Sequence, residues 1–284
     1  MYDVISMVRF AKETSGIKLF RSQCQTAKTG IKTLWRPVAI SGLFAALQAP
    51  IAHAQLVPVP ARPGIGAGDT RRQVGVEDLP WSAIGRVQTE LGGRCTGFLI
   101  APAVVETAAH CLWIAKTGHY IQPRDVHFLR AYSRGQFASH ARVARFLIPP
   151  GYDPRRETLT AAYDRATLFL DAPAGTPTQS LTVAQNLPAP GDGVMLGGYE
   201  QDFREVVTSD MACHVMAIVA DGNGQPMISH NCDATRGSSG APLLVYRNGN
   251  WIVTGVQVLA NFGRGGAAAP LMPVASEKTH DDRR

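Results

Sequence analysis

Between residues 235 and 242 the chain reads Thr-Arg-Gly-Ser-Ser-Gly-Ala-Pro, so that two serines, Ser238 and Ser239, stand between glycines. A serine hydroxyl becomes a good nucleophile only when a neighbouring base takes its proton, and backbone N–H groups must then hold the oxyanion that forms. Glycines allow the backbone to turn sharply and to approach a substrate closely. Alone, however, a run of this kind is more often a simple loop between two strands.

Two other stretches change that interpretation, because they contain the partners that such a serine needs. His110 lies in the run Thr107-Ala108-Ala109-His110-Cys111, and Asp164 lies just before the apolar run 167–170. An imidazole can accept and return a proton near neutral pH, and a carboxylate can fix its tautomer and stabilise the imidazolium. Rival aspartates in less suitable positions are Asp153, Asp171 and Asp202.

Together these stretches resemble the trypsin-like serine protease family. Segment 95–111 is similar to the family's histidine region, segment 164–168 to its aspartate segment, and segment 237–242 to its nucleophile loop. The order histidine, aspartate, serine is that of the chymotrypsin-like enzymes. Residues 80–85 and 197–199 resemble the bacterial glutamyl-endopeptidase-like (V8-like) branch.

The resemblance implies a role for each candidate residue. Ser239 is the expected nucleophile, because the family's reactive serine lies two residues after the glycine that is here Gly237, and His110 and Asp164 complete the triad. The backbone N–H groups of Gly237 and Ser239 are expected to form the oxyanion hole. Ser238 stands where the trypsin branch has an aspartate that pairs with a newly freed amino terminus, and a serine cannot form that ion pair.

Substrate recognition is expected on both sides of the serine loop. Asp233 lies six residues before Ser239, the offset at which a trypsin-like enzyme places its carboxylate for Lys or Arg. Gln257 follows Gly255-Val256 where the glutamyl-endopeptidase-like branch has a histidine, and this difference weakens a strict preference for Glu. Val258, Leu259 and Ala260 are expected to form an edge that pairs with an extended substrate strand.

The remaining sequence predicts an all-β fold. Short apolar runs alternate with Gly and Pro turns, and hardly any stretch has helical periodicity, a pattern typical of a sandwich or barrel. The resemblance selects two Greek-key, six-stranded β-barrels with the active site in the cleft between them. We place the N-terminal barrel at residues 80–175 and the C-terminal barrel at residues 176–275, because prolines gather between positions 173 and 190.

The two ends of the sequence differ from this core. Residues 1–54 combine a basic stretch, an apolar run and an Ala-His-Ala cleavage signal, so they predict an export segment that leaves no stable membrane anchor after cleavage. Residues 55–79 are rich in Pro and Gly and predict a linker or pro-segment. Within them, Arg71-Arg72 is equally consistent with a processing site and with a solvated pair of side chains. Residues 276–284 predict a polar tail.

The distribution of charged residues along the sequence bears on the kind of partner that the protein binds. The net charge is +6, but seven of the 28 Lys and Arg residues and two of the 22 Asp and Glu residues fall in residues 1–54. The remainder has 21 basic and 20 acidic residues, so we expect no nucleic-acid partner.

Five cysteines are present, of which Cys24 lies in the export segment. The other four allow three connectivities. Sequence proximity and the family resemblance favour Cys95–Cys111 with Cys213–Cys232, which implies an oxidising compartment. Because these bridges would consume the cysteines and no CxxC or HExxH spacing is present, we expect no metal and no cofactor.

These features predict a monomeric, secreted or periplasmic serine endopeptidase that cleaves a protein or peptide substrate through an acyl-enzyme on Ser239. Two alternatives use the same residues: a non-catalytic protease-like binding protein, and an esterase with the same triad. The presence of all three triad residues disfavours the binding protein. Comparing turnover of amide and ester substrates separates the esterase from the peptidase.

Overall fold

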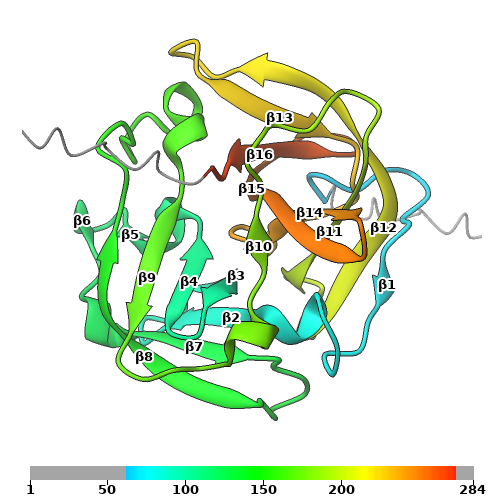
Figure 1. The fold of residues 1–284 in the computed structure, drawn as a ribbon. Helices are drawn as coiled ribbons and strands as arrows, with labels where there is room; N and C mark the ends of the chain where they lie inside the picture. The colour runs from blue at the N-terminus through cyan, green and yellow to red at the C-terminus, as the bar shows by residue number, and fades with distance from the viewer. Residues whose placement is uncertain (1–61, 273–284) are drawn as a thin grey trace, which may run out of the picture. The chain divides into compact units, whose positions relative to one another are not determined.

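The computed structural model describes residues 62–272, which form β-strands joined by loops and short 3₁₀ turns (Figure 1). The predicted export segment 1–54 and the predicted tail 276–284 lie outside the described residues. The 3₁₀ turns are η1 (Trp81–Ala83), η2 (Ala109–Leu112), η3 (Pro123–Asp125), η4 (Glu157–Leu159), η5 (Ala161–Tyr163) and η6 (Pro177–Gln179). Across residues 62–272, no helix has the length and apolar character needed to cross a membrane.

The first barrel is a closed ring of six antiparallel strands. Its strands are β2 (Ile84–Thr89), β3 (Arg94–Ala101), β4 (Val104–Thr107), β7 (Val126–Arg130), β8 (Ser139–Leu147) and β9 (Ala166–Leu170). Every second residue of β7 and β9 is buried, because successive side chains of a strand point to opposite faces. Phe128, Leu168 and Val105 fill the interior that this alternation creates.

The second barrel is also a ring of six antiparallel strands, closed by the pairing of β12 with β13. Its strands are β11 (Gly193–Glu200), β12 (Phe203–Ala220), β13 (Pro226–His230), β14 (Pro242–Arg247), β15 (Asn250–Ala260) and β16 (Gly266–Pro270). If the six strands of each barrel are renumbered 1 to 6 along the chain, neighbouring strands around the ring follow the order 1-2-3-6-5-4 in both barrels. The repeated order confirms the expected pair of six-stranded barrels.

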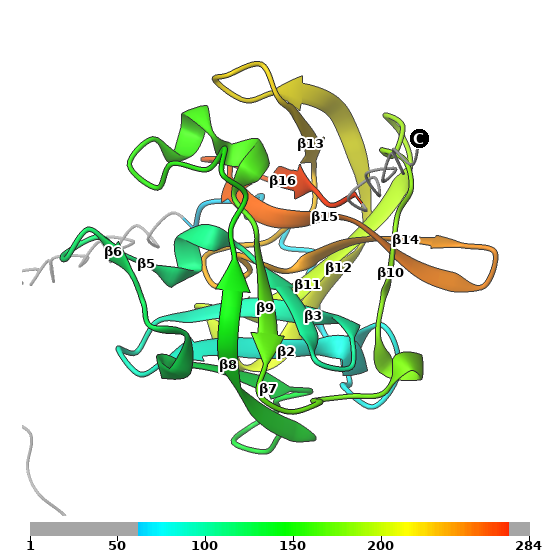
Figure 2. The same ribbon diagram turned by 60° about the vertical axis from the view of Figure 1, so that its left-hand side comes forward.

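Four short strands lie outside these rings. They are β1 (Arg72–Gln73), β5 (Trp113–Ile114), β6 (His119–Tyr120) and β10 (Thr182–Val183). β5 and β6 form their own small sheet, β10 runs parallel to β15, and β1 pairs with β12. Figure 1 shows β1 at the side of the second barrel, next to the long strand β12, and Figure 2 shows β8 and β9 of the first barrel side by side.

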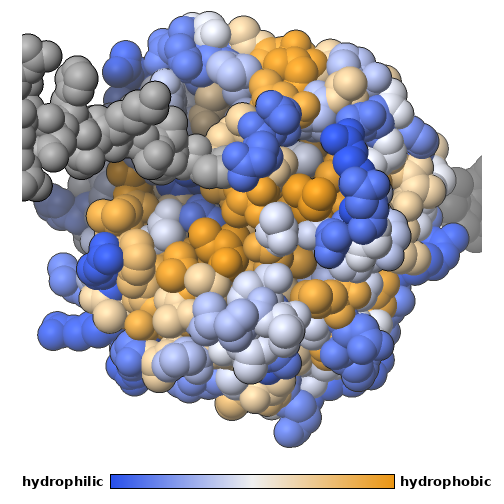
Figure 3. Space-filling view, in the orientation of Figure 1, coloured by the Kyte–Doolittle hydropathy of each residue, from blue (hydrophilic) through white to orange (hydrophobic). Residues whose placement is uncertain are grey.

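The two barrels meet through buried apolar side chains. One buried cluster contains Phe98 and Ala108 from the first barrel together with Tyr199 and Val256 from the second. On the face seen in Figure 1, hydrophobic residues gather toward the centre and hydrophilic residues lie mainly around the edge (Figure 3). A shared core of this kind holds the loops at the junction in fixed positions, because packed interiors resist deformation.

Residues 62–74, part of the predicted linker, are bonded to the second barrel. Gly64 N–H donates to Asn261 C=O over 2.7 Å, and Val74 N–H donates to Val207 C=O over 3.1 Å. The sequence gives no sign of these contacts, since a Pro- and Gly-rich segment has little apolar surface to bury. Both predicted disulfides, Cys95–Cys111 and Cys213–Cys232, are confirmed.

Candidate active site

His110 and Asp164 are joined directly beside the first barrel. His110 lies on η2, and Asp164 directly follows η5. Asp164 Oδ2 lies 2.6 Å from His110 Nδ1, and Asp164 Oδ1 accepts a hydrogen bond from the His110 backbone N–H over 2.9 Å. Because an ionised carboxylate only accepts, Nδ1 is assigned as the donor and Nε2 is the basic nitrogen of the neutral ring.

The surroundings of this pair favour the protonated imidazole. Burial alone would lower the pKa of His110, but the hydrogen bond to Asp164 and the carboxylate charge outweigh it and raise that pKa above 6.5. The Asp164 side chain is 3% exposed and the His110 side chain is 24% exposed, so the ring remains reachable from outside. The pair can therefore take up a proton and stabilise the charge that results.

Thr96 on β3 ties the serine loop to the first barrel. Its backbone N–H donates to Ser239 C=O over 2.9 Å, and its Oγ1 donates to Gly237 C=O over 2.9 Å. The same Oγ1 accepts from Tyr199 N–H on β11 over 2.9 Å, and Thr96 is fully buried. Sequence reasoning missed this residue, because a threonine within a strand carries no sign of such distant partners.

Gly240 brings the serine loop against the segment that leads to His110. A Cβ at this position would lie 2.3 Å from Thr107 Oγ1 and 2.9 Å from Ala108 N, so only glycine fits. The loop therefore lies beside the start of η2. Ser239 Oγ makes no hydrogen bond to another residue of the 62–272 region, so Ser239 is linked to His110 through neighbouring backbone rather than by a direct bond.

The two serines of the loop have different surroundings. Ser238 is 3% exposed, and its Oγ donates to Thr235 C=O over 2.6 Å. Both serines line a hollow of about 320 Å³, but Ser239 is the more exposed of the two. The buried hydroxyl is occupied as a structural donor, which leaves Ser239 as the hydroxyl that a ligand in the hollow can reach.

The backbone N–H groups of Gly237 and Ser239 are the two expected oxyanion donors of the serine loop. Its φ of +95° is in the left-handed region, and a Cβ there would lie 2.4 Å from Tyr199 O. In the part of the chain that the structure describes, neither the Gly237 N–H nor the Ser239 N–H donates to a protein acceptor. Free N–H groups next to a reachable hydroxyl are what a developing oxyanion requires.

Residues 257–260, at the end of β15, line the same hollow as Ser239, which we call the serine hollow. Gln257 Oε1 lies 2.7 Å from His230 Nε2, and Gln257 Nε2 donates to Leu259 C=O over 2.9 Å. Burial lowers the pKa of His230 to about 4, so this ring is neutral near pH 7. His230 thus fixes the Gln257 amide from behind, a role that its isolated position in the sequence does not indicate.

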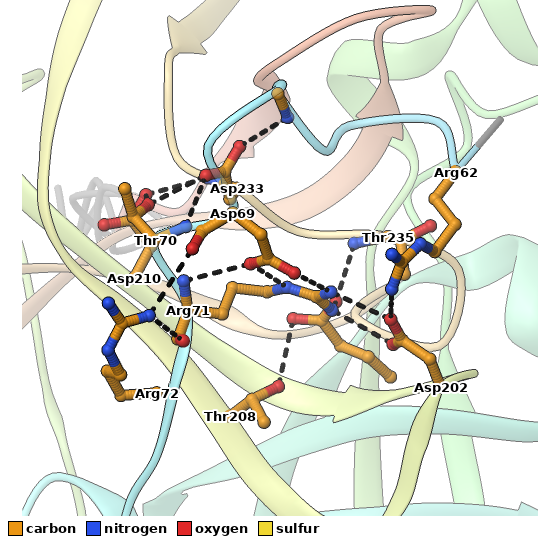
Figure 4. A network of polar contacts seen from close by, with 12 residues as sticks. Arg62, Asp69, Thr70, Arg71, Arg72, Asp202, Thr208, Asp210, Asp233 and Thr235 are labelled. Carbon is orange, nitrogen blue, oxygen red and sulfur yellow. Dashed lines mark hydrogen bonds and ion pairs between the residues drawn. The ribbon is translucent and has the colours of Figure 1, made fainter. Parts of the chain in front are cut away.

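Asp233 does not line the serine hollow, although the sequence places it at the offset of a specificity carboxylate. It is fully buried, and its two oxygens accept hydrogen bonds from Gly66 N–H over 2.8 Å and Thr70 N–H over 2.9 Å (Figure 4). The nearby Arg264 Nε lies 3.4 Å from Oδ1. Through these partners Asp233 anchors residues 62–74. Because both of its oxygens are already bonded, neither is free for a substrate cation.

Arg71 forms a second anchor for the same segment. Its guanidinium donates to Asp69, Glu200 and Asp202, and its side chain is 1% exposed (Figure 4). Burial raises the pKa of Glu200 to about 7, against the lowering effect of Arg71. For Asp202, burial is outweighed by hydrogen bonds from Arg71 and Arg62, which lower its pKa to about 2.

The Glu200 end of this network touches the serine loop. Glu200 Oε2 accepts the Thr235 N–H over 2.9 Å, and Gln201 N–H donates to Arg236 C=O over 2.7 Å. Arg71 therefore supports the loop that carries Gly237 through Glu200. Of the two residues considered as a processing site, Arg71 is buried in this network and Arg72 is exposed.

Cys95, His110 and Cys111 have ligand atoms within 4.8 Å of one another, a spacing that could suit a metal ion. The two sulfurs are bonded to each other, however, and His110 Nδ1 is bonded to Asp164. A disulfide sulfur is not a thiolate ligand, so this cluster offers only one imidazole nitrogen.

The chymotrypsin-like serine proteases have this architecture: two barrels with the same strand order, and a serine in a glycine-containing loop where the barrels meet. The chain belongs to the trypsin family, whose family model matches residues 69–276. A curated relative, the glutamyl endopeptidase of Bacillus licheniformis, is 28% identical over 111 residues. That match covers 39% of this chain and 33% of the relative, so the chain spans about a third of the relative's length.

Solved structures share the fold at low sequence identity. A Glu endopeptidase superposes with a TM-score of 0.61 at 21% identity, and the match covers 74% of this chain and 94% of the other. A thermostable serine protease from an extremophilic microorganism superposes with a TM-score of 0.52 at 21% identity, covering 66% of this chain and 91% of the other. These likenesses confirm the two-barrel fold.

Proposed function

We propose that this protein is a secreted or periplasmic serine endopeptidase that hydrolyses peptide bonds through an acyl-enzyme on Ser239. The observation that carries the proposal is the His110–Asp164 pair, in which both carboxylate oxygens accept hydrogen bonds from the same histidine. That arrangement leaves Nε2 as a base on the side away from Asp164. The two disulfides support an oxidising compartment outside the cytoplasm.

In the first half of the reaction, Ser239 Oγ attacks the scissile carbonyl carbon while His110 Nε2 takes its proton. Asp164 stabilises the imidazolium and does not itself take the proton. The carbonyl oxygen becomes an oxyanion held by the N–H groups of Gly237 and Ser239. The C–N bond then breaks as Nε2 returns the proton to the leaving amine, and the acyl group remains on Oγ.

In the second half, water replaces the amine. His110 takes a proton from the water as its oxygen attacks the ester carbon, and the Ser239 Oγ–carbon bond breaks with the proton returned to Oγ. The backbone of residues 258–260 supports an extended acyl segment by strand pairing. Gln257, held by His230, is a neutral amide in the wall of the serine hollow, which Asp233 does not line.

The direct test compares the two adjacent serines. Ser239→Ala should remove nearly all turnover of a protein substrate while leaving the protein folded, because the nucleophile contributes a large part of kcat, roughly 10⁶-fold in a well-studied serine protease. Ser238→Ala is the matched control, since it removes only a buried hydrogen bond worth about 1 kcal/mol. The measurements are casein hydrolysis and labelling by a fluorophosphonate.

Three results would count against the proposal. They are full activity in Ser239→Ala, loss of labelling in Ser238→Ala but not in Ser239→Ala, and a folded wild-type protein that is never labelled. The last would favour a protease-like binding protein instead.

A further inference from the structure

Four arginines line one hollow beside the serine loop, and the proposed chemistry of the triad does not use it. We call this space, of about 440 Å³, the arginine hollow. Its arginines are Arg86, Arg94, Arg204 and Arg236, and Gly237 forms part of its wall. Arg94, Arg204 and Arg236 are exposed to solvent, whereas the Arg86 side chain is 8% exposed.

The positive charge of the arginine hollow is only partly balanced. Arg86 packs 3.6 Å above the centre of the Tyr132 ring and lies 3.4 Å from Glu205 Oε1. Glu200, the acidic residue in the wall, is buried and already bonded to Arg71.

The other three arginines lack acidic partners. Arg204 donates from Nε to Gln201 C=O over 2.9 Å, which leaves its charge unopposed. Among residues 62–272, none of Arg94, Arg204 and Arg236 forms an ion pair, so their charges face the hollow and the solvent.

The arginine hollow adjoins the expected oxyanion donor Gly237, which forms part of its wall. Arg236 lines both the serine hollow and the arginine hollow, so the two spaces flank the Arg236-Gly237 backbone. Residues 257–260 belong to the serine hollow, which takes the acyl part of an extended substrate. A peptide that extends from the serine hollow past Gly237 would enter the arginine hollow.

The disulfide beside His110 also indicates that the substrate segment after the scissile bond lies toward the arginine hollow. Arg94 is the first residue of β3 and precedes Cys95, whose bonded partner Cys111 adjoins His110. His110 is the group that returns a proton to the leaving amine in the proposed reaction. The arginine hollow is thus next to the residue that serves the leaving segment.

We propose that the arginine hollow is a binding subsite for an acidic side chain of the substrate, located one to three residues after the scissile bond. This inference rests on the proposed endopeptidase function and adds a substrate class to it. A guanidinium offers several N–H donors in a planar fork that matches a carboxylate, so Asp or Glu is recognised by both charge and geometry. Exposed pairs of this kind are screened by salt, which gives the subsite a measurable signature.

The experiment uses internally quenched peptides that share every residue up to the scissile bond. A parent sequence that the enzyme cleaves is chosen from a peptide library, and Asp, Asn or Lys is then placed at each of the three positions that follow the bond. At low ionic strength we expect kcat/KM to be about threefold to fivefold higher for the best Asp peptide than for its Asn counterpart, with Lys below Asn. Adding about 0.5 M NaCl should bring the three values together.

Variants assign the effect to the arginine hollow. The double variant Arg94→Gln/Arg204→Gln should lower the Asp-to-Asn ratio toward one, with Arg236 left to account for what remains. Arg124→Gln is the control for charge removal in general, because it removes one positive charge from a side chain that is 82% exposed on η3 and outside the hollow. The control should keep the wild-type ratio.

Two outcomes overturn the inference alone: equal cleavage of the Asp and Asn peptides by wild-type enzyme, and an unchanged ratio in the double variant. Either outcome would be measured on an enzyme that cleaves peptides and reacts with a fluorophosphonate, so the proposed function would stand. If no peptide is cleaved and no label is taken up, the proposed function fails and this inference fails with it.

Discussion

Arg71 and Glu200 form an ion pair in which each side chain is 1% exposed. Arg71 comes from the segment that precedes the first barrel, and Glu200 is the last residue of β11. Because Glu200 also accepts the Thr235 N–H, the pair links residues 62–74 to the loop that carries the oxyanion donors.

The first prediction follows from that pair. Arg71→Met leaves the Glu200 carboxylate buried without its cation, so we expect the free energy of unfolding to fall by about 3–5 kcal/mol. We also expect kcat to fall more than KM changes, since Arg71 positions the loop without touching substrate. Urea unfolding and steady-state kinetics measure the two effects.

Two further variants test the reason for that effect. Arg72→Met changes the neighbouring exposed arginine and should alter stability by less than about 0.5 kcal/mol. Adding Glu200→Gln to Arg71→Met removes the unpaired charge and should restore part of the lost stability. If Arg71→Met and Arg72→Met behave alike, the ion pair does not support the loop.

The second prediction concerns Thr96. Thr96→Val keeps the shape of the side chain but removes the hydroxyl that bonds to Gly237 and Tyr199, and each buried group left unpaired costs about 1–3 kcal/mol. We expect lower stability together with a lower kcat, because Gly237 C=O loses its tether. Thr96→Ser retains the hydroxyl and should stay close to wild type in kcat, whereas equal loss in both variants would point to packing alone.

The third prediction concerns Gly237. A methyl group at Gly237→Ala would meet the Tyr199 carbonyl at 2.4 Å, so the backbone must shift and its N–H must turn from the oxyanion position. Loss of one such donor lowers kcat by about 10²- to 10³-fold. Gly135 also has positive φ, with open space around it, so Gly135→Ala controls for backbone strain. Equal kcat values in the two variants would contradict the role given to Gly237.

The fourth prediction is a pH dependence. The general base must be neutral, and Asp164 raises the pKa of His110 above 6.5, so kcat/KM should fall as pH drops through a value above 6.5. In Asp164→Asn the carboxylate charge is gone while burial remains. The acid limb should then move to lower pH, and kcat should fall by roughly 10⁴-fold because the tautomer is no longer fixed.

A second aspartate provides the comparison for this pH profile. Asp171 accepts the Arg142 N–H over 3.0 Å and takes no part in the candidate site. Asp171→Asn should therefore keep the wild-type acid limb. An unshifted limb in Asp164→Asn would show that the titration belongs to another group.

The local sequence was enough to predict several features of this protein. Alternating apolar runs with Gly and Pro turns indicated the all-β fold, and three motifs in order indicated the trypsin family. The disulfide pairs followed from proximity along the chain and from the resemblance. The assignment of Ser239, Gly237 and their partners to catalysis stays a prediction, which the geometry of His110 and Asp164 supports.

Other features were decided only when the barrels closed. Thr96 and Gly237 are 141 positions apart, and Arg71 and Glu200 are 129 positions apart, so no local pattern could pair them. The sequence offset of Asp233 suggested a substrate contact, yet burial against residues 66–70 directs both its oxygens elsewhere. A motif records which side chains are present, whereas ring closure decides which of them are buried, bonded to one another or left facing solvent.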